Sequence, residues 1–148
     1  MTDIETQNLA VARRYVEQFL GKGDMSLATE LLADNVQIIT GLKPTSPIDG
    51  IEEYKQIFSG FYDAFPDVKP LTIEDSFATG DRVVVRFKSF QQHVKDYFGI
   101  PKSDRVITFH ETHVMRIING KIVENIVSAT NLEFEMLLAP VLAPLILT

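Results

Sequence analysis

Glu111 and His113 are the two residues whose types and spacing point most directly to chemistry. Side chains two apart on a strand share one face, with about 6–7 Å between their Cα atoms. An ionisable pair in an apolar row is costly unless each member has a partner. We therefore predict that both side chains face an internal cavity. The apolar row that they interrupt consists of Ile107, Phe109, Met115 and Ile117.

A desolvated carboxylate at position 111 can act as a base on an acidic C–H group next to a carbonyl. His113 would orient this carboxylate or donate a hydrogen bond to the developing enolate oxygen. The alternative is a structural polar cluster that satisfies itself through neighbouring polar side chains. Those neighbours would be Tyr15, Gln91 or Ser128.

The pair lies in a predicted β-hairpin that spans residues 105–132. Asn119 and Gly120 form its turn, because a two-residue type I′ turn needs positive φ at both central positions. The turn fixes a register in which Ile117 faces Ile122 and His113 faces Ile126. In the same register Glu111 faces Ser128 and Phe109 faces Thr130. Three residues of the second strand would then line the cavity as ligand-binding residues: Ile126, Ser128 and Thr130.

The preceding strand, residues 82–94, also has one inward row. Its even positions carry the charges, so its odd positions are predicted to face the core. This row is apolar at first and polar later, and it ends in His93, which either reaches the cavity mouth or anchors a loop. His110 is expected to face outward. The ligand-binding candidates of this row are Phe87, Gln91 and His93.

Three helices are predicted before the main strands. The first is amphipathic and spans residues 6–20, and Tyr15, at the border of its apolar stripe, is a ligand-binding candidate. The second is short, capped by Asp24, and reaches residue 32. The third spans residues 51–65 after a cap at Asp49, and is rich in aromatic residues. Most of these aromatics would pack in the core, while Tyr54 and Phe58 are candidates for the cavity.

Short strands at residues 35–40 and 68–77 and a final helix at residues 131–139 complete the expected elements. Helices followed by a mostly antiparallel sheet define an α+β fold, with a long curved sheet and a space beneath its helices. The 148 residues form one expected domain (1–148), with a core at 6–138 and an apolar tail at 139–148. The tail would cover the cavity mouth or, as we favour, lie in a dimer interface.

Composition restricts the function classes. The net charge of −6 and the pI of about 5.0 argue against nucleic-acid binding and against anionic membrane surfaces. The polar N-terminus does not resemble a signal peptide, and the apolar tail is too short to span a bilayer, so we expect a cytoplasmic protein. Cysteine is absent, and His110 and His113 face opposite ways, so no metal site is expected. Without a glycine-rich phosphate loop, no cofactor is expected either.

Four motifs together resemble one known family: FPD (65–67), GDRV (80–83), GIP (99–101) and the run VMRIINGKIVENI (114–126). The sequence resembles the SnoaL-like polyketide cyclases of the nuclear-transport-factor-2-like (cystatin-like) superfamily over about residues 9–138. The resemblance implies a cone-shaped domain in which a curved mixed or antiparallel sheet and about three helices enclose a cavity. It also implies acid–base chemistry on a polyketide-type carbonyl compound and a homodimer.

Glu111 and His113 match the polar residue and the histidine that the family carries on its penultimate strand. Thr130 stands where the family carries an aspartate, and Ile126 stands where it often has a tryptophan. We therefore expect a cofactor-independent lyase or isomerase of the polyketide cyclase type that acts on a small hydrophobic carbonyl compound. The alternatives are a non-catalytic small-molecule-binding protein and a dimeric accessory protein of the same fold.

Overall fold

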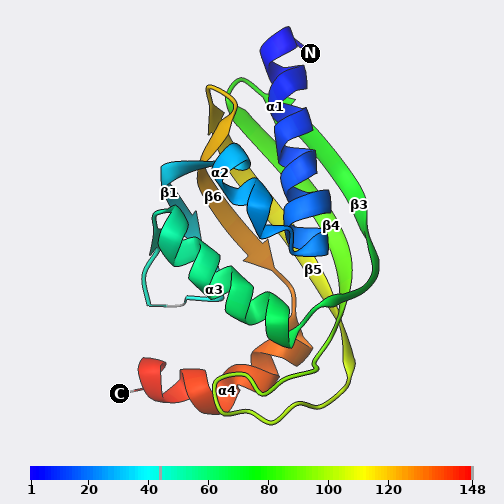
Figure 1. The fold of residues 1–148 in the computed structure, drawn as a ribbon, viewed down its shortest axis with the longest axis vertical. Coiled ribbons are helices and arrows are strands. Elements are labelled where there is room, and N and C mark those ends of the chain that lie inside the picture. Colours follow the sequence, from blue (N-terminus) through cyan, green and yellow to red (C-terminus); the bar gives the residue numbers. More distant parts are fainter. Residues whose placement is uncertain (44, 148) are drawn as a thin grey trace.

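The computed structural model describes residues 1–43 and 45–147, and its elements form an α+β fold (Figure 1). Pro44, in the expected loop, and Thr148, at the end of the expected tail, lie outside the described residues. The described residues form four α-helices, where the resemblance implied about three. The helices are α1 (Asp3–Arg14), α2 (Ala28–Leu31), α3 (Ile51–Ala64) and α4 (Leu132–Ile146). The strands are β1 (Leu32–Ile39), β2 (Ile48–Asp49), β3 (Asp67–Thr79), β4 (Arg82–Gln92), β5 (Val106–Ile118) and β6 (Lys121–Ala129).

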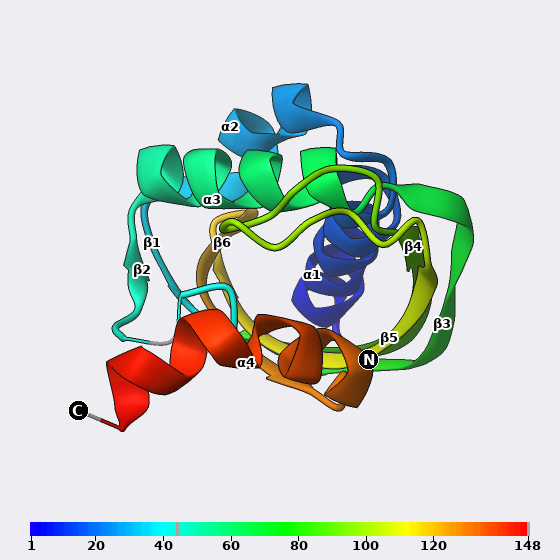
Figure 2. The same cartoon turned by 90° about the horizontal axis from the view of Figure 1, so that it is seen from below.

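The six strands form one mixed sheet in the order β2-β1-β6-β5-β4-β3. Only β1 and β6 run parallel, and the other neighbours are antiparallel. Figure 2 shows that the sheet curls into an arc, with α1 inside the curve, α3 across its open side and α4 near the rim. The concave face therefore looks onto helices rather than onto solvent.

The first helix starts earlier than the sequence indicated. Thr2 and Glu5 form a capping box, in which each side chain accepts from the other residue's backbone N–H, so α1 begins at Asp3. The helix continues into a π-helical turn, Tyr15–Leu20, which buries Tyr15 and Phe19. This irregular turn places the Tyr15 hydroxyl inside the fold.

The predicted cap of the third helix is wrong. Gly50 occupies the N-cap position with φ +93°, which favours glycine. The Asp49 carboxylate instead accepts a hydrogen bond from Nε2 of Gln37 on β1. The helix itself, α3, agrees with the predicted range to within one residue and buries Tyr54 and Phe58 as part of its inner face.

The C-terminal segment differs most from expectation, because the predicted helix 131–139 continues as α4 through residue 146. Pro140 and Pro144 lie inside this helix, although each removes a backbone donor. Phe134 and Leu138, which precede the expected tail, bury their side chains against the core, and Leu142 of the tail is partly buried against it. Among the helices of the described chain, none has the length and apolarity needed to cross a membrane.

The hairpin turn was predicted correctly, but the register beyond it was not. Asn119 and Gly120 have φ values of +51° and +78°, and Ile117 faces Ile122. The register then shifts, because Arg116 pairs with Glu124 and one extra residue of β6 is accommodated. As a result His113 faces Val127, and Glu111 faces Ala129. The residues expected on the cavity face instead lie exposed on the other side: Ile126, Ser128 and Thr130.

The turn provides a test of the hairpin geometry. Gly120→Ala should lower the free energy of unfolding by about 1 kcal/mol, because alanine tolerates positive φ poorly while the new Cβ would meet no neighbour within 4 Å. Gly60→Ala is the matched control, since Gly60 is equally uncrowded but lies within α3. It should stabilise the protein by about 1 kcal/mol in urea denaturation. Equal effects of the two substitutions would contradict this assignment.

Candidate active site

A cavity of about 210 Å³ lies between the concave face of the sheet, α3 and α4. Most of its lining is apolar, with side chains such as Phe58, Phe61 and Phe109. Ligand cavities typically combine such a lining with a few convergent polar groups. The polar lining residues are Thr40, Tyr54, Glu111, His113, Asn131 and Glu135.

Glu111 and His113 contact each other on this lining. Nε2 of His113 lies 2.9 Å from Oε1 of Glu111. The His113 side chain is 3% exposed and that of Glu111 is 20% exposed, so the pair is shielded from bulk water. Phe87 lies against the imidazole ring, with 5.1 Å between ring centroids. The carboxylate is thus the more accessible member and the imidazole is its buried partner.

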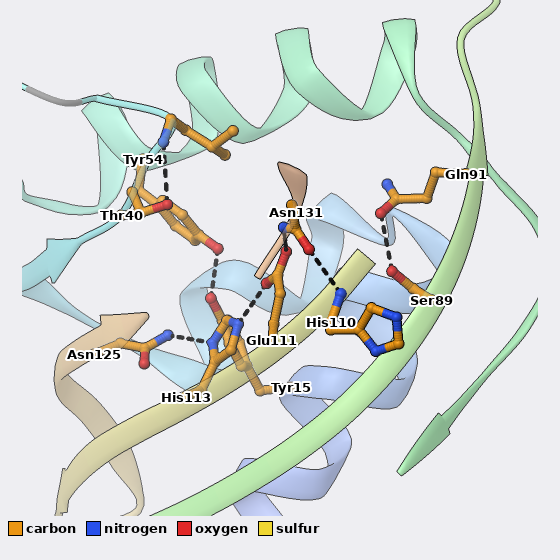
Figure 3. A network of polar contacts seen from close by, with 11 residues as sticks. Tyr15, Thr40, Tyr54, Ser89, Gln91, His110, Glu111, His113, Asn125 and Asn131 are labelled. Atoms are coloured by element: carbon orange, nitrogen blue, oxygen red, sulfur yellow. Dashed lines mark hydrogen bonds and ion pairs between the residues drawn. The ribbon is translucent and has the colours of Figure 1, made fainter. Parts of the chain in front are cut away.

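Asn125 on β6 holds the other side of the imidazole. Its Nδ2 lies 2.9 Å from Nδ1 of His113 (Figure 3). An amide N–H only donates, so Nδ1 is the acceptor and Nε2 carries the proton that is donated to Glu111. Asn125 is fully buried, and its Oδ1 has no partner among the described residues. The sequence analysis missed this residue, because only the register shift in β6 turns it inward.

Two tyrosines extend the polar network. The hydroxyl groups of Tyr15 and Tyr54 are hydrogen-bonded to each other, and both side chains are buried. Burial raises the pKa of Tyr15, and hydrogen bonds to Tyr54 and Asn125 partly offset this effect. Burial also raises the pKa of Tyr54. Both phenols therefore stay protonated at neutral pH. When Tyr15 is the donor in their shared hydrogen bond, the single hydroxyl proton of Tyr54, which lines the cavity, is available to a bound oxygen.

The inward row predicted for β4 is buried, including Phe87 and Gln91. These two residues line a second, smaller cavity of about 30 Å³, which also reaches Glu111. Gln91 is held in place there, because Nε2 donates to the backbone oxygen of Phe65 at 2.6 Å and Oε1 accepts from Ser89 Oγ at 3.0 Å. Neither residue lines the larger cavity.

His93 lies away from both cavities and is fully buried. Its ring stacks on Phe65 with 4.5 Å between centroids, and its Nδ1 accepts from the backbone N–H of Ser103 at 3.1 Å. It therefore anchors the loop before β5 rather than standing at the cavity mouth. Ser128 and Thr130 do not line the main cavity either, and they border a hollow that is shared with Arg86, His110 and Glu111.

Asp67, at the start of β3, is a second carboxylate near Glu111 that the sequence analysis did not single out. It lines the 30 Å³ cavity together with Glu111, and its Oδ1 is buried without a partner among the described residues. Burial, and secondarily the charge of Glu111, raises the pKa of Asp67 to about 7. In the sequence it stood only as the last residue of the FPD motif, between the third predicted helix and the strand predicted at residues 68–77.

The described residues contain no group of three His, Cys, Asp or Glu side chains arranged to hold a metal ion.

Asn131 contributes weakly to the main site, because its Nδ2 lies 3.4 Å from Oε2 of Glu111. Its Oδ1 accepts from the backbone N–H of His110 at 2.7 Å. The chemistry that these side chains themselves offer is therefore a carboxylate base, an oriented imidazole and a phenol donor.

The raised pKa of Asp67 predicts a pH-dependent effect on stability. The folded protein holds the Asp67 proton more tightly than the unfolded chain does. The resulting contribution to stability is fully present below the unfolded pKa of 3.8, and it is lost as the pH rises through the folded pKa of about 7. Asp67→Asn should therefore be more stable than the wild type by roughly 1–2 kcal/mol at pH 8, a value reduced for solvent screening of a partly exposed group. Near pH 3.5 the two proteins should be about equally stable.

Urea denaturation at both pH values measures this difference. Asp75→Asn is the matched control, because Asp75 lies on the same strand but is exposed. It should show no comparable change with pH. A stability difference for Asp67→Asn that is the same at both pH values would contradict the buried carboxyl.

A sequence profile described as SnoaL-like polyketide cyclase matches residues 10–135. No curated protein matches the chain by sequence. Several solved structures share the fold, among them a candidate SnoaL-like polyketide cyclase from Jannaschia sp. CCS1, with a TM-score of 0.80 and 19% identity over 92% of this chain and 94% of that one.

IdmH, a candidate polyketide cyclase from Streptomyces antibioticus, has a TM-score of 0.73 and 23% identity, covering 90% of this chain and 99% of that chain. AclR, a candidate hydroxylase from Streptomyces galilaeus, has a TM-score of 0.75 and 17% identity, covering 89% and 84%. At these identities the structures show the fold alone, whereas the profile covers most of the sequence. The chain therefore belongs to the SnoaL-like polyketide cyclase family.

Proposed function

We propose that the protein is a cofactor-independent acid–base enzyme, a lyase or isomerase of the cyclase type, acting on a small hydrophobic carbonyl compound. The observation that carries this proposal is the Glu111–His113 contact on the wall of an otherwise apolar cavity. A carboxylate shielded from water, and held by a hydrogen bond, is suited to take a proton from a C–H group beside a carbonyl.

In the proposed reaction the substrate lies in the 210 Å³ cavity with its acidic C–H near Glu111. Glu111 takes the proton and becomes a neutral carboxylic acid, while the C–H electron pair moves to the carbonyl and forms an enolate. Tyr54 donates a hydrogen bond to the enolate oxygen, which carries the developing charge. In an isomerisation the substrate is a β,γ-unsaturated ketone, and Glu111 returns the proton to the γ carbon of the resulting dienolate. In a cyclisation the enolate carbon instead attacks a second carbonyl of the same molecule. In that second case the new alkoxide takes the proton from Glu111.

His113 acts in this scheme by positioning the base. Its single Nε2 proton is donated to Glu111, and its Nδ1 is occupied by Asn125. The imidazole therefore fixes the carboxylate orientation, and the role of enolate donor passes to Tyr54. Phe58 would contribute apolar contact with the substrate, since it also lines the cavity.

Glu111→Gln tests the base assignment. We expect the exchange of the acidic C–H protons of 2-tetralone, a bicyclic ketone, for deuterium in D₂O to be faster with the wild type than in buffer. The substitution should reduce this enhancement by about 10²–10⁴-fold, because glutamine cannot accept the proton. Proton NMR follows the loss of the signal. Glu74→Gln, on the exposed side of β3, is the control and should exchange at the wild-type rate.

A second candidate function is non-catalytic binding of a small hydrophobic molecule. The inward residues of β6 are Asn125, Val127 and Ala129, so this strand brings no carboxylate to the cavity. In that case 2-tetralone would raise the melting temperature, while exchange in the wild type would stay at the buffer rate or be unaffected by Glu111→Gln. Either exchange result would reject the enzymatic proposal.

We also propose that the protein works as a cytoplasmic homodimer. Exposed apolar side chains on α4 support an interface there, since Leu132 and Met136 are 66% and 67% exposed. Light scattering of the purified protein should then give twice the chain mass of 16.7 kDa. Leu132→Lys combined with Met136→Lys should shift the mass to that of one chain, and an unchanged mass of the double variant would place the interface elsewhere.

A further inference from the structure

Three spaces lie in series around Glu111 and Asp67. The main cavity reaches Glu111 from the side of His113. The cavity of about 30 Å³ touches both Glu111 and Asp67. Asp67 also borders an open groove of about 870 Å³ between the first helical segment and β3. Asp67 therefore lies between Glu111 and the outer groove, and α4, which lines the main cavity, lines neither of the other two spaces.

The small cavity is suited to water. A volume of about 30 Å³ exceeds the roughly 10–15 Å³ that one water needs, and such a water also requires polar partners. Glu111 and Asp67 supply carboxylate oxygens, and Ser89 and Gln91 supply further polar atoms. The Asp67 Oδ1 atom, buried without a partner among the described residues, needs such a donor.

We propose that Asp67 is a proton-relay residue, which exchanges the proton of Glu111 with the outer groove through water in the small cavity. The proposal rests on the proposed function, in which Glu111 is the base. Asp67 acts through Glu111 and does not touch the substrate. Protons thereby leave by one route while the substrate enters by another, so the base can be reset while the main cavity remains occupied.

The proton balance of the relay is simple. Glu111, protonated by the substrate, transfers its proton to the intervening water, and that water releases a proton to the Asp67 carboxylate. Asp67 then loses the proton to water in the groove, and both carboxylates return to their starting state. The reverse sequence delivers a proton to Glu111 when the reaction consumes one. No oxidant, reductant or cofactor is required.

Charged and titratable groups from several elements accompany Asp67 on the groove side. Burial and the Glu111 charge raise the pKa of Asp67 to about 7, close to the value at which a carboxyl both takes and gives protons in neutral solution. The Tyr62 hydroxyl approaches Asp67 from α3, and its own pKa is raised by burial and by the Asp67 charge. The other charged groups that line the groove are Arg13, Glu17, Lys22 and Lys69.

The first test needs no turnover and follows carboxyl ¹³C signals during a pH titration of labelled protein. In the wild type, Asp67 should titrate well above an ordinary aspartate. In Glu111→Gln its titration should move to lower pH, because the neighbouring negative charge is gone. The carboxyl signal of Asp75, which is exposed on the same strand, is the internal control and should not differ between the two proteins. A titration of Asp67 that is unchanged by Glu111→Gln would overturn the relay.

The second test measures deuterium exchange into 2-tetralone by Asp67→Asn at low buffer concentration. Turnover should fall by about tenfold or more, with the KM unchanged. Added formate, a small acid able to enter the groove, should restore much of the rate, as should Asp67→Glu. Asp75→Asn should exchange like the wild type.

The outcomes separate the relay from the base assignment. An undiminished rate in Asp67→Asn overturns the relay, as does a loss that neither formate nor Asp67→Glu restores, because that pattern indicates a structural role. Wild-type exchange in Glu111→Gln instead overturns the proposed function. The titration still decides whether the two carboxyls are coupled.

Discussion

The structure depends on the cost of placing ionisable groups inside an apolar enclosure. The cost for Glu111 and His113 is offset by a chain of hydrogen bonds to side chains from separate elements. Asn125 comes from β6 and Tyr15 from the first helical segment, and Tyr54 comes from α3. Each partner satisfies one polar group and leaves the cavity side of Glu111 and Tyr54 available. The polar line therefore ties the sheet to both helical segments at the point where the chemistry is proposed.

The register shift in β6 decides which partners are present. Without it, Ile126 would face the cavity and Asn125 would face outward. The imidazole would then lack a donor at Nδ1, and its tautomer would no longer be fixed. One extra residue in a strand thus determines the protonation pattern of a pair on the neighbouring strand.

Much of the fold could be predicted from the sequence, because its signals are local. The turn at Asn119 and Gly120, the alternation in β4 and β5 and the aromatic stripe of α3 all follow from residue spacing. The inward orientation of Glu111 and His113 follows from the same alternation. The remaining errors concern non-local effects. Nothing in the local sequence marks the bulge in β6. The extension of α4 beyond residue 139 accompanies the packing of Phe134 and Leu138 against distant parts of the chain, which local spacing does not reveal.

Pro140 and Pro144 give α4 a mechanical property that distinguishes it from the sheet. Each proline lacks the N–H that would bond to the carbonyl four residues earlier, so the carbonyls of Met136 and Pro140 lose those helical partners. The helix that covers the main cavity is consequently held by fewer backbone hydrogen bonds than a regular helix of its length, whereas the opposite wall is a hydrogen-bonded sheet. A bend in α4 would therefore change the volume of the main cavity without moving the strand that carries Glu111 and His113.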